Sequence, residues 1–162
     1  MESYQQEYRE MEPDDAKLWG DDGSGVEGFV SGNRLTLNEN FELVATTTAA
    51  NAFTAGEVGY LVAAGTITMA DADAVASVNP LIVMALGTIA AGEEGTFQMP
   101  VGKKVTVTGH GFTVGAALYI SGTAGELTST APGSGDFVRI VAYALDANTL
   151  YFTGGGGIAA GS

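Results

Sequence analysis

Apolar and polar residues alternate in short runs along most of the chain from Phe29 onward. A period of two residues is typical of half-buried β-strands, and it is clearest in Val105–Thr108. Turns that contain Gly, Asn or Pro separate the runs. The expected strands are 34–37, 42–44, 59–62, 66–69, 81–88, 96–99, 105–108, 117–120, 127–128, 137–145 and 150–152. Roughly ten short strands at this spacing predict an all-β fold, a compact sandwich or barrel.

Two stretches depart from simple alternation. The longest apolar run, Leu81–Ala91, has about half the length needed to span a bilayer. It is therefore interpreted as a strand that is buried on both faces. The Ala-rich stretch Ala70–Pro80 before it predicts one helical turn or a loop, and Pro80 ends it.

The segment 137–145, "FVRIVAYAL", has two apolar faces. Strict alternation places Val138, Ile140, Ala142 and Ala144 on one face and Arg139, Val141, Tyr143 and Leu145 on the other. Two apolar faces indicate that one is covered by a second sheet, the N-terminal arm or a neighbouring subunit. The candidates for a subunit interface are Val141, Tyr143, Leu145 and Tyr151.

The composition changes near residue 28. Residues 1–28 contain nine acidic and two basic residues, and they end in a linker, "GDDGSG", after Leu18 and Trp19. Such a segment is either a disordered acidic tail or an arm that becomes ordered on a partner, and its aromatic residues favour the arm. We therefore expect an extended acidic arm over 1–28, a β body over 29–153 and a flexible Gly-rich tail over 154–162.

Charge and cysteine content exclude several classes of function. The 19 acidic and 6 basic residues give a net charge of −13, which argues against binding to nucleic acid or to anionic membranes. The chain has no cysteine, so disulfides, thiolate zinc sites and Cys nucleophiles are excluded. The acidic N-terminus lacks the apolar region of a secretory signal.

No motif of catalysis or cofactor binding stands out. His110 is the only histidine, and its setting "TGHGF" favours a turn or surface role. Asp71 and Asp73 lack the spacing of a calcium loop, and Glu93–Glu94 is a pair of charges in a turn. We expect no enzymatic activity, no catalytic, cofactor-binding or metal-binding residue, and no small-molecule substrate.

Two long stretches resemble structural proteins of tailed bacteriophages. These are residues 55–109, "AGEVGYLVAAGTITMADADAVASVNPLIVMALGTIAAGEEGTFQMPVGKKVTVTG", and 115–152, "GAALYISGTAGELTSTAPGSGDFVRIVAYALDANTLYF". The family comprises capsid decoration and head-fibre proteins. In the second stretch the resemblance rests on Gly115, Leu118, Tyr119, Ser121, Gly125, Leu127, Thr128, Pro132, Val138, Arg139, Ala144, Leu145, Tyr151 and Phe152. Ala142 departs from the pattern, which usually has Gly there. Residues 1–28 lie outside the resemblance.

The resemblance implies a capsid decoration (cement) protein on the outer surface of the virion, made in the host cytoplasm. It implies binding to the major capsid protein and assembly as a homotrimer. We expect the arm to bind the capsid through Tyr4, Tyr8, Leu18 and Trp19.

Two alternatives remain. The first is a fibre or host-recognition module that binds a cell-surface glycan or protein, with Tyr119, Tyr143 and Tyr151 as candidates. The second, a polysaccharide depolymerase, is disfavoured by the short chain and by the missing carboxylate signature.

Overall fold

The body of the protein consists of two β modules that share a hydrophobic core. The structure is a computed structural model, and it describes residues 36–63, 65–78 and 80–161. The all-β prediction is confirmed, because 43% of the described residues are in strands and 3% in helix. The predicted helical turn is present as α2 (Val75–Val78). The predicted arm, with Tyr4, Tyr8, Leu18 and Trp19, lies outside the described residues.

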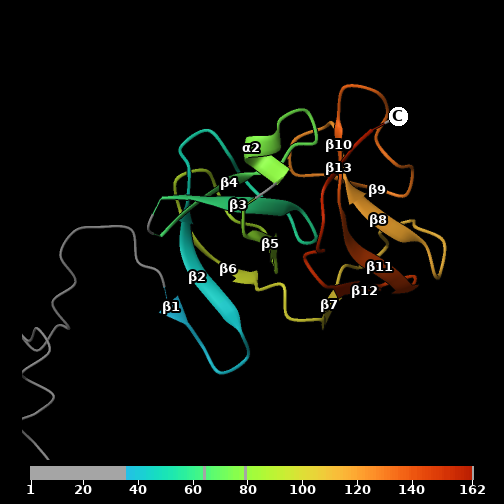
Figure 1. The fold of residues 1–162 in the computed structure, drawn as a ribbon. Coiled ribbons are helices and arrows are strands. Elements are labelled where there is room, and N and C mark those ends of the chain that lie inside the picture. Colours follow the sequence, from blue (N-terminus) through green and yellow to red (C-terminus); the bar gives the residue numbers. More distant parts are fainter. Residues whose placement is uncertain (1–35, 64, 79, 162) are drawn as a thin grey trace, which may run out of the picture. The chain divides into compact units, whose positions relative to one another are not determined.

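The first module is a closed five-stranded barrel (Figure 1). Its strands are β2 (Glu42–Thr47), β3 (Val58–Ala63), β4 (Thr66–Met69), β5 (Ile82–Ala85) and β6 (Glu94–Gln98), and β1 (Thr36–Leu37) pairs with β2. The order is β2-β4-β3-β5-β6, and β6 pairs with β2 to close the barrel. The β2–β4 pair is parallel and the other barrel pairs are antiparallel. Closure leaves no free edge among these five strands.

Strand β5 contributes residues to both hydrophobic clusters of the body. All four of its residues are fully buried, which confirms the prediction of a strand buried on both faces. Val83 and Ala85 belong to the cluster with Phe53 and Phe97, whose rings meet edge to face at 5.3 Å. The alternate residues of β5, Ile82 and Met84, belong to the core that the barrel shares with the second module.

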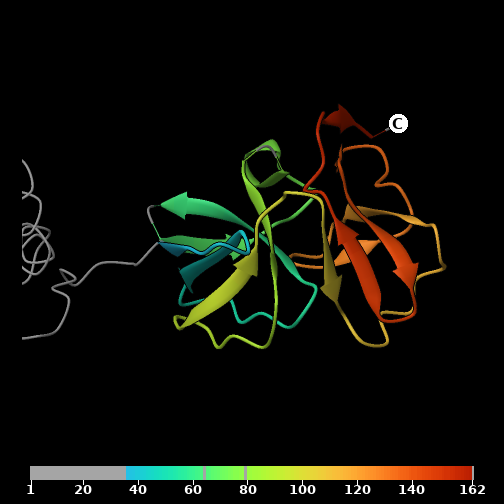
Figure 2. The same ribbon diagram turned by 90° about the horizontal axis from the view of Figure 1, so that it is seen from below.

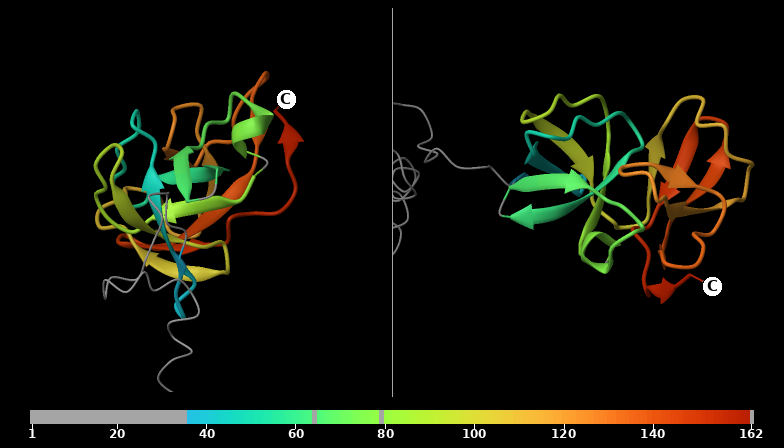
Figure 3. Two further views of the ribbon diagram at one scale, coloured as in Figure 1. Left: turned by 90° about the vertical axis from the view of Figure 1, so that its left-hand side faces the viewer. Right: turned by 90° about the horizontal axis from the view of Figure 1, so that it is seen from above.

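The second module is an antiparallel sheet in the order β7-β12-β11-β8-β9. Its strands are β7 (Lys103–Thr106), β8 (Ala117–Ile120), β9 (Leu127–Thr128), β11 (Ile140–Asp146) and β12 (Thr149–Phe152). Leu118, Val141 and Phe152 of this sheet pack in the same core cluster as Ile82 and Met84 of the barrel. Figures 2 and 3 show the two modules side by side. One face of the second sheet is thereby buried and the other faces outward.

The C-terminal segment is bonded to the body, so the prediction of a flexible tail is wrong for residues 154–161. Its strand β13 (Ala159–Ala160) pairs with β10 (Phe137–Val138), and the amide of Gly161 donates to the carbonyl of Asp136. Glycine favoured flexibility in the sequence, but here it allows close packing. A Cβ atom on Gly155 would collide with the carbonyl oxygen of Ile140.

The turn between β1 and β2 contains a strained residue. The amide of Phe41 donates to the carbonyl of Asn38, and that of Asn38 to Glu42, which defines a three-residue hairpin loop. Phe41 closes this loop with a φ of 58°. A left-handed conformation costs an L-residue with a side chain about 1–2 kcal/mol, so this position normally takes Gly or Asn.

Candidate functional site

A β-bulge in β11 decides which residues of the second sheet face outward. Ile140 pairs with Tyr119 and Ala142 pairs with Leu118, so Val141 is an extra residue on β11. Val141 and Ala142 are consecutive, yet both are fully buried. The prediction of Val141 as an interface residue is therefore wrong, because it lies in the core. The predicted common face of Val138, Ile140, Ala142 and Ala144 is also broken by the bulge.

Beyond this bulge, alternation holds from Ala142 to Ala144, and two tyrosines face outward. Tyr143 and Tyr151 are direct cross-strand partners on β11 and β12, and they are 39% and 37% exposed. Leu145 is 38% exposed and lies at a second irregularity of β11, between Ala144 and Asp146. Tyr119, half-buried on β8, lies on the outward side as well, because its neighbours Leu118 and Ile120 point into the core. We call Tyr119, Tyr143, Leu145 and Tyr151 the tyrosine face.

The tyrosine face extends as a row across four strands. Tyr151 pairs with Lys104 of β7, and Tyr143 pairs with Ala117 of β8. Directly paired residues project to the same side of a sheet, so the row runs Lys104, Tyr151, Tyr143, Ala117. The row presents one ammonium group, two phenol rings and a methyl group. It can bind a partner by ring contacts and by hydroxyl hydrogen bonds.

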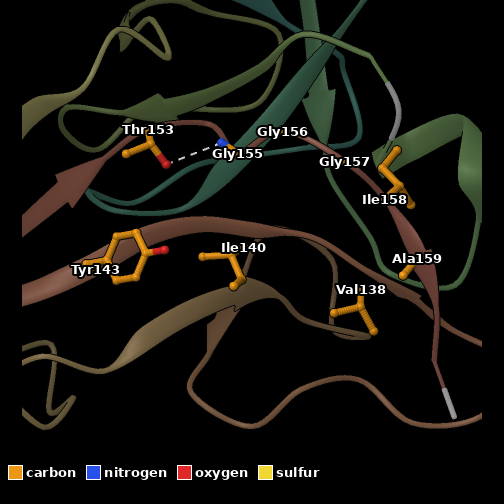
Figure 4. A pocket seen from close by; sticks show the side chains of 9 residues that line it. All are labelled: Val138, Ile140, Tyr143, Thr153, Gly155, Gly156, Gly157, Ile158 and Ala159. Atoms are coloured by element: carbon orange, nitrogen blue, oxygen red, sulfur yellow. Dashed lines mark hydrogen bonds between the residues drawn. The ribbon is translucent and has the colours of Figure 1, made fainter.

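An open groove adjoins the tyrosine face at Tyr143. Its volume is about 630 Å³, and it lies between β11 and the C-terminal segment (Figure 4). We call it the C-terminal groove, and its lining consists of Val138, Ile140, Tyr143, Thr153, Gly155, Gly156, Gly157, Ile158 and Ala159. None of these nine side chains is charged. The tyrosine hydroxyl points toward the middle of the groove in Figure 4. A groove of this size and polarity suits an uncharged ligand or an apolar chain segment.

Arg139 holds in place the C-terminal segment that forms one wall of the C-terminal groove. This residue is 9% exposed, and its Nε donates to the carbonyl of Gly154 at 2.9 Å. Its guanidinium also donates to the carbonyls of Gly155, Pro80 and Val78. Burial lowers the pKa of Arg139 from its ordinary value, although a guanidinium remains charged at neutral pH. Arg139 thus ties the α2–β5 connection of the barrel to the C-terminal segment.

Sequence reasoning missed this role of Arg139. Strict alternation placed it on the same face as Tyr143, whereas it is buried and Tyr143 is exposed. One signal was present in the sequence, because Arg139 is the only charged residue in "FVRIVAYAL". A lone charge within an apolar strand has to find hydrogen-bond partners if the strand is buried.

His110 serves as a turn residue. Its Nε2 lies 2.7 Å from the carbonyl oxygen of Asp146, and its Nδ1 accepts from the amide of Phe112 at 3.1 Å. The imidazole also stacks on the ring of Phe112, with 5.4 Å between the centroids. Both ring nitrogens are therefore occupied by backbone groups. The carboxyl of Asp146 accepts from the amide of Asn148 at 2.8 Å, and this hydrogen bond is the main cause of its lowered pKa.

Three carboxylates approach one another beside the barrel. The negative charge of Asp71 raises the pKa of Asp73, and slight desolvation and the charge of Asp136 add to the rise. Within the part of the chain that the structure describes, no group of three or more His, Cys, Asp or Glu side chains is arranged to hold a metal ion. At neutral pH the negative charges of these carboxylates repel one another.

Asp73→Asn should raise the urea midpoint of unfolding at pH 7. The pKa of Asp73 is higher in the folded chain than in the unfolded one, so the folded chain binds the proton more tightly between those values. The free energy of unfolding therefore falls as pH rises through this window, and it stays at the lower level at neutral pH. The advantage of Asp73→Asn should shrink toward pH 3, where the wild-type carboxyl is protonated. Glu126→Gln, which changes the net charge equally, should not show this trend, and a pH-independent gain for Asp73→Asn would contradict the prediction.

Comparison with known proteins identifies no relative of this chain. No protein-family model, no curated protein and no solved structure matches the chain. Among the residues that the structure describes, no helix has the length and apolar character required to cross a bilayer. The tyrosine face and the C-terminal groove are therefore interpreted from their own chemistry, which is that of contact surfaces.

Proposed function

We propose that the protein is a non-enzymatic structural component of a tailed-phage virion that decorates the capsid by binding the major capsid protein. The observation that carries this proposal is the tyrosine face. The resemblance of residues 55–152 to phage decoration and head-fibre proteins supports the same conclusion. Decoration needs a compact, soluble body that presents contact surfaces and carries no chemistry.

The tyrosine face supports self-association. Strands β11 and β12 lie inside the second sheet, each with a neighbour on both sides. Outward positions on such strands are usually polar in a monomer, but here Tyr143, Leu145 and Tyr151 are each more than a third exposed. Tyrosine is enriched at protein interfaces because a large rigid ring is combined with a polar hydroxyl. A homotrimer would also multiply weak contacts between each arm and the capsid.

A binding experiment with phage heads tests the proposal. Heads of the encoding phage, assembled without this protein, should bind the full chain. A full-length variant with Tyr4, Tyr8, Leu18 and Trp19 replaced by serine should lose at least tenfold in affinity, since these residues are the proposed apolar anchors. Light scattering should give the same oligomer mass for both proteins. Equal binding by both would show that the arm is not the anchor.

A second variant separates assembly from capsid binding. Tyr143→Ser combined with Tyr151→Ser should reduce the oligomer to a monomer while leaving the circular dichroism of the body unchanged. Its apparent affinity for heads should fall because the arms no longer bind together. Val114→Ser serves as a control and should keep the wild-type oligomer mass, because Val114 is exposed but lies outside the tyrosine face. An unchanged oligomer mass in the double variant would contradict the role of the tyrosine face.

The C-terminal groove favours one second candidate function, the recognition of an uncharged glycan on a host cell. The groove combines one aromatic ring, that of Tyr143, with the exposed backbone of Gly156 and Gly157. This combination suits sugars, which present apolar faces and many hydroxyls. A cell-adsorption assay distinguishes the two functions. A host-recognition module should compete with phage for cells, whereas a decoration protein should not.

A further inference from the structure

Phe41 occupies a position where this chain otherwise uses glycine. Among the described residues, eleven glycines have a positive φ, and Phe41 is the only residue of another type that does. The loop geometry at Phe41 requires a left-handed residue but no side chain. Glycine would satisfy this turn with less strain. The phenyl ring is therefore present although it makes the turn less stable than glycine would.

The ring of Phe41 is exposed. Its residue is 52% exposed, so much of its apolar surface contributes nothing to the core. The backbone of Phe41 is nevertheless fixed, because its carbonyl accepts from the amide of Met99 and from the side chain of Gln98, both at 3.0 Å. Because the backbone that holds the exposed ring is already ordered, little conformational entropy is lost when a partner binds it.

Further apolar side chains accompany Phe41 at this end of the barrel. Leu37 is 54% exposed and Val101 is 47% exposed. The β6–β7 connection that carries Val101 is bonded to the turn through the amide of Met99, which donates to the carbonyl of Phe41. At the start of β7, Nζ of Lys103 donates to the carbonyl of Asn40 at 2.6 Å. Figure 1 shows the β1–β2 turn projecting at the lower end of the barrel. We call Leu37, Phe41 and Val101 the Phe41 tip.

Charge indicates what kind of surface the Phe41 tip fits. Glu39 and Glu42 lie on either side of the ring in the sequence, and Lys103 is the basic residue bonded to the turn. Pairing of this tip with the tip of a second copy would bring Glu39 and Glu42 of both chains together, and these like charges would repel one another. An anionic lipid surface or a nucleic acid would be repelled as well. The complementary partner is a protein surface with an apolar pocket bordered by basic side chains.

We propose that the Phe41 tip is a second capsid contact, in which the ring of Phe41 inserts into an apolar pocket of the major capsid protein bordered by Lys or Arg. This inference rests on the proposed function and adds a contact made by the body to the contact made by the arm. Residues 1–35 join the body at Thr36, five residues before Phe41. The arm and the tip are therefore close to one another in the sequence.

The test compares Phe41→Asn with the wild-type chain on heads assembled without this protein. Asn tolerates the left-handed conformation, so the urea midpoint of Phe41→Asn should be equal to or above that of the wild type. Its affinity for heads should fall at least tenfold. The fall in wild-type affinity with added salt should be steeper than that of a variant with Glu39→Gln and Glu42→Gln. Val114→Asn removes another exposed apolar side chain, 66% exposed, and should bind like the wild type.

The possible outcomes separate this inference from the proposed function. Wild-type binding together with equal binding by Phe41→Asn would overturn the inference alone. A lower urea midpoint of Phe41→Asn together with weaker binding would assign Phe41 a packing role and would also overturn the inference. Heads that bind no wild-type protein would overturn the proposed function and the inference with it. Loss of binding with full stability supports the Phe41 tip as a capsid contact.

Discussion

Replacing Arg139 with methionine should lower the free energy of unfolding by about 3–5 kcal/mol. The guanidinium donates to backbone carbonyls of Val78, Pro80, Gly154 and Gly155, which belong to two separate segments. A hydrogen bond to a charged group contributes about 1.5–3 kcal/mol, and a buried carbonyl left without its donor is itself unfavourable. Methionine keeps the apolar stem in place but supplies no donor. The expected loss is a large fraction of the stability of a small domain.

Urea unfolding followed by circular dichroism measures this loss, and two variants control it. Lys104→Met removes an exposed base from the second sheet and should change the free energy of unfolding by no more than about 0.5 kcal/mol. Arg139→Lys keeps the charge but cannot reach both segments, so it should recover only part of the loss. Faster hydrogen exchange in residues 155–160 of Arg139→Met would locate the damage at the C-terminal segment. A loss below about 1 kcal/mol would show that the carbonyls find other donors.

The strands of this fold were predictable because their signal is local. Alternation and turn residues placed Ala117–Ile120 and Leu127–Thr128 where β8 and β9 lie. The fully apolar stretch that became β5 was also recognisable, since both faces of that strand are buried. Strand β7 was displaced by two residues, because Lys103 and Lys104 did not fit the apolar pattern. Pairing with β12 gives these two lysines their strand conformation.

Features that depend on contacts distant in sequence were not predictable. Closure of the barrel through the β2–β6 pair joins segments about fifty residues apart, and no local pattern reports it. The bulge at Val141 is set by the register between β11 and β8, and it reversed the predicted face of that residue. Tyr143, Leu145 and Tyr151 are exposed as an interface would require, yet their role in assembly stays a prediction.

Phe152→Ala should destabilise the whole body by about 3–5 kcal/mol, the usual cost of truncating a fully buried phenylalanine. Phe152 lies on β12 with no exposed surface, and it belongs to the core cluster that includes Ile82 and Met84 of the barrel. Because a cavity there removes contacts from both modules, we expect one unfolding transition with a lower midpoint and an unchanged slope.

Hydrogen exchange resolved by strand tests whether the two modules unfold together. In Phe152→Ala, the amides of β5 in the barrel should lose as much protection as those of β11 in the second sheet. Phe97→Ala provides the matched variant, since Phe97 is also fully buried but packs in the separate cluster inside the barrel. Because both clusters include residues of β5, Phe97→Ala should in turn reduce protection in β11. Loss of protection confined to the mutated module in either variant would mean that the shared core does not couple them. The C-terminal groove and the tyrosine face would then depend on the second sheet alone, whereas coupling makes both surfaces depend on the barrel.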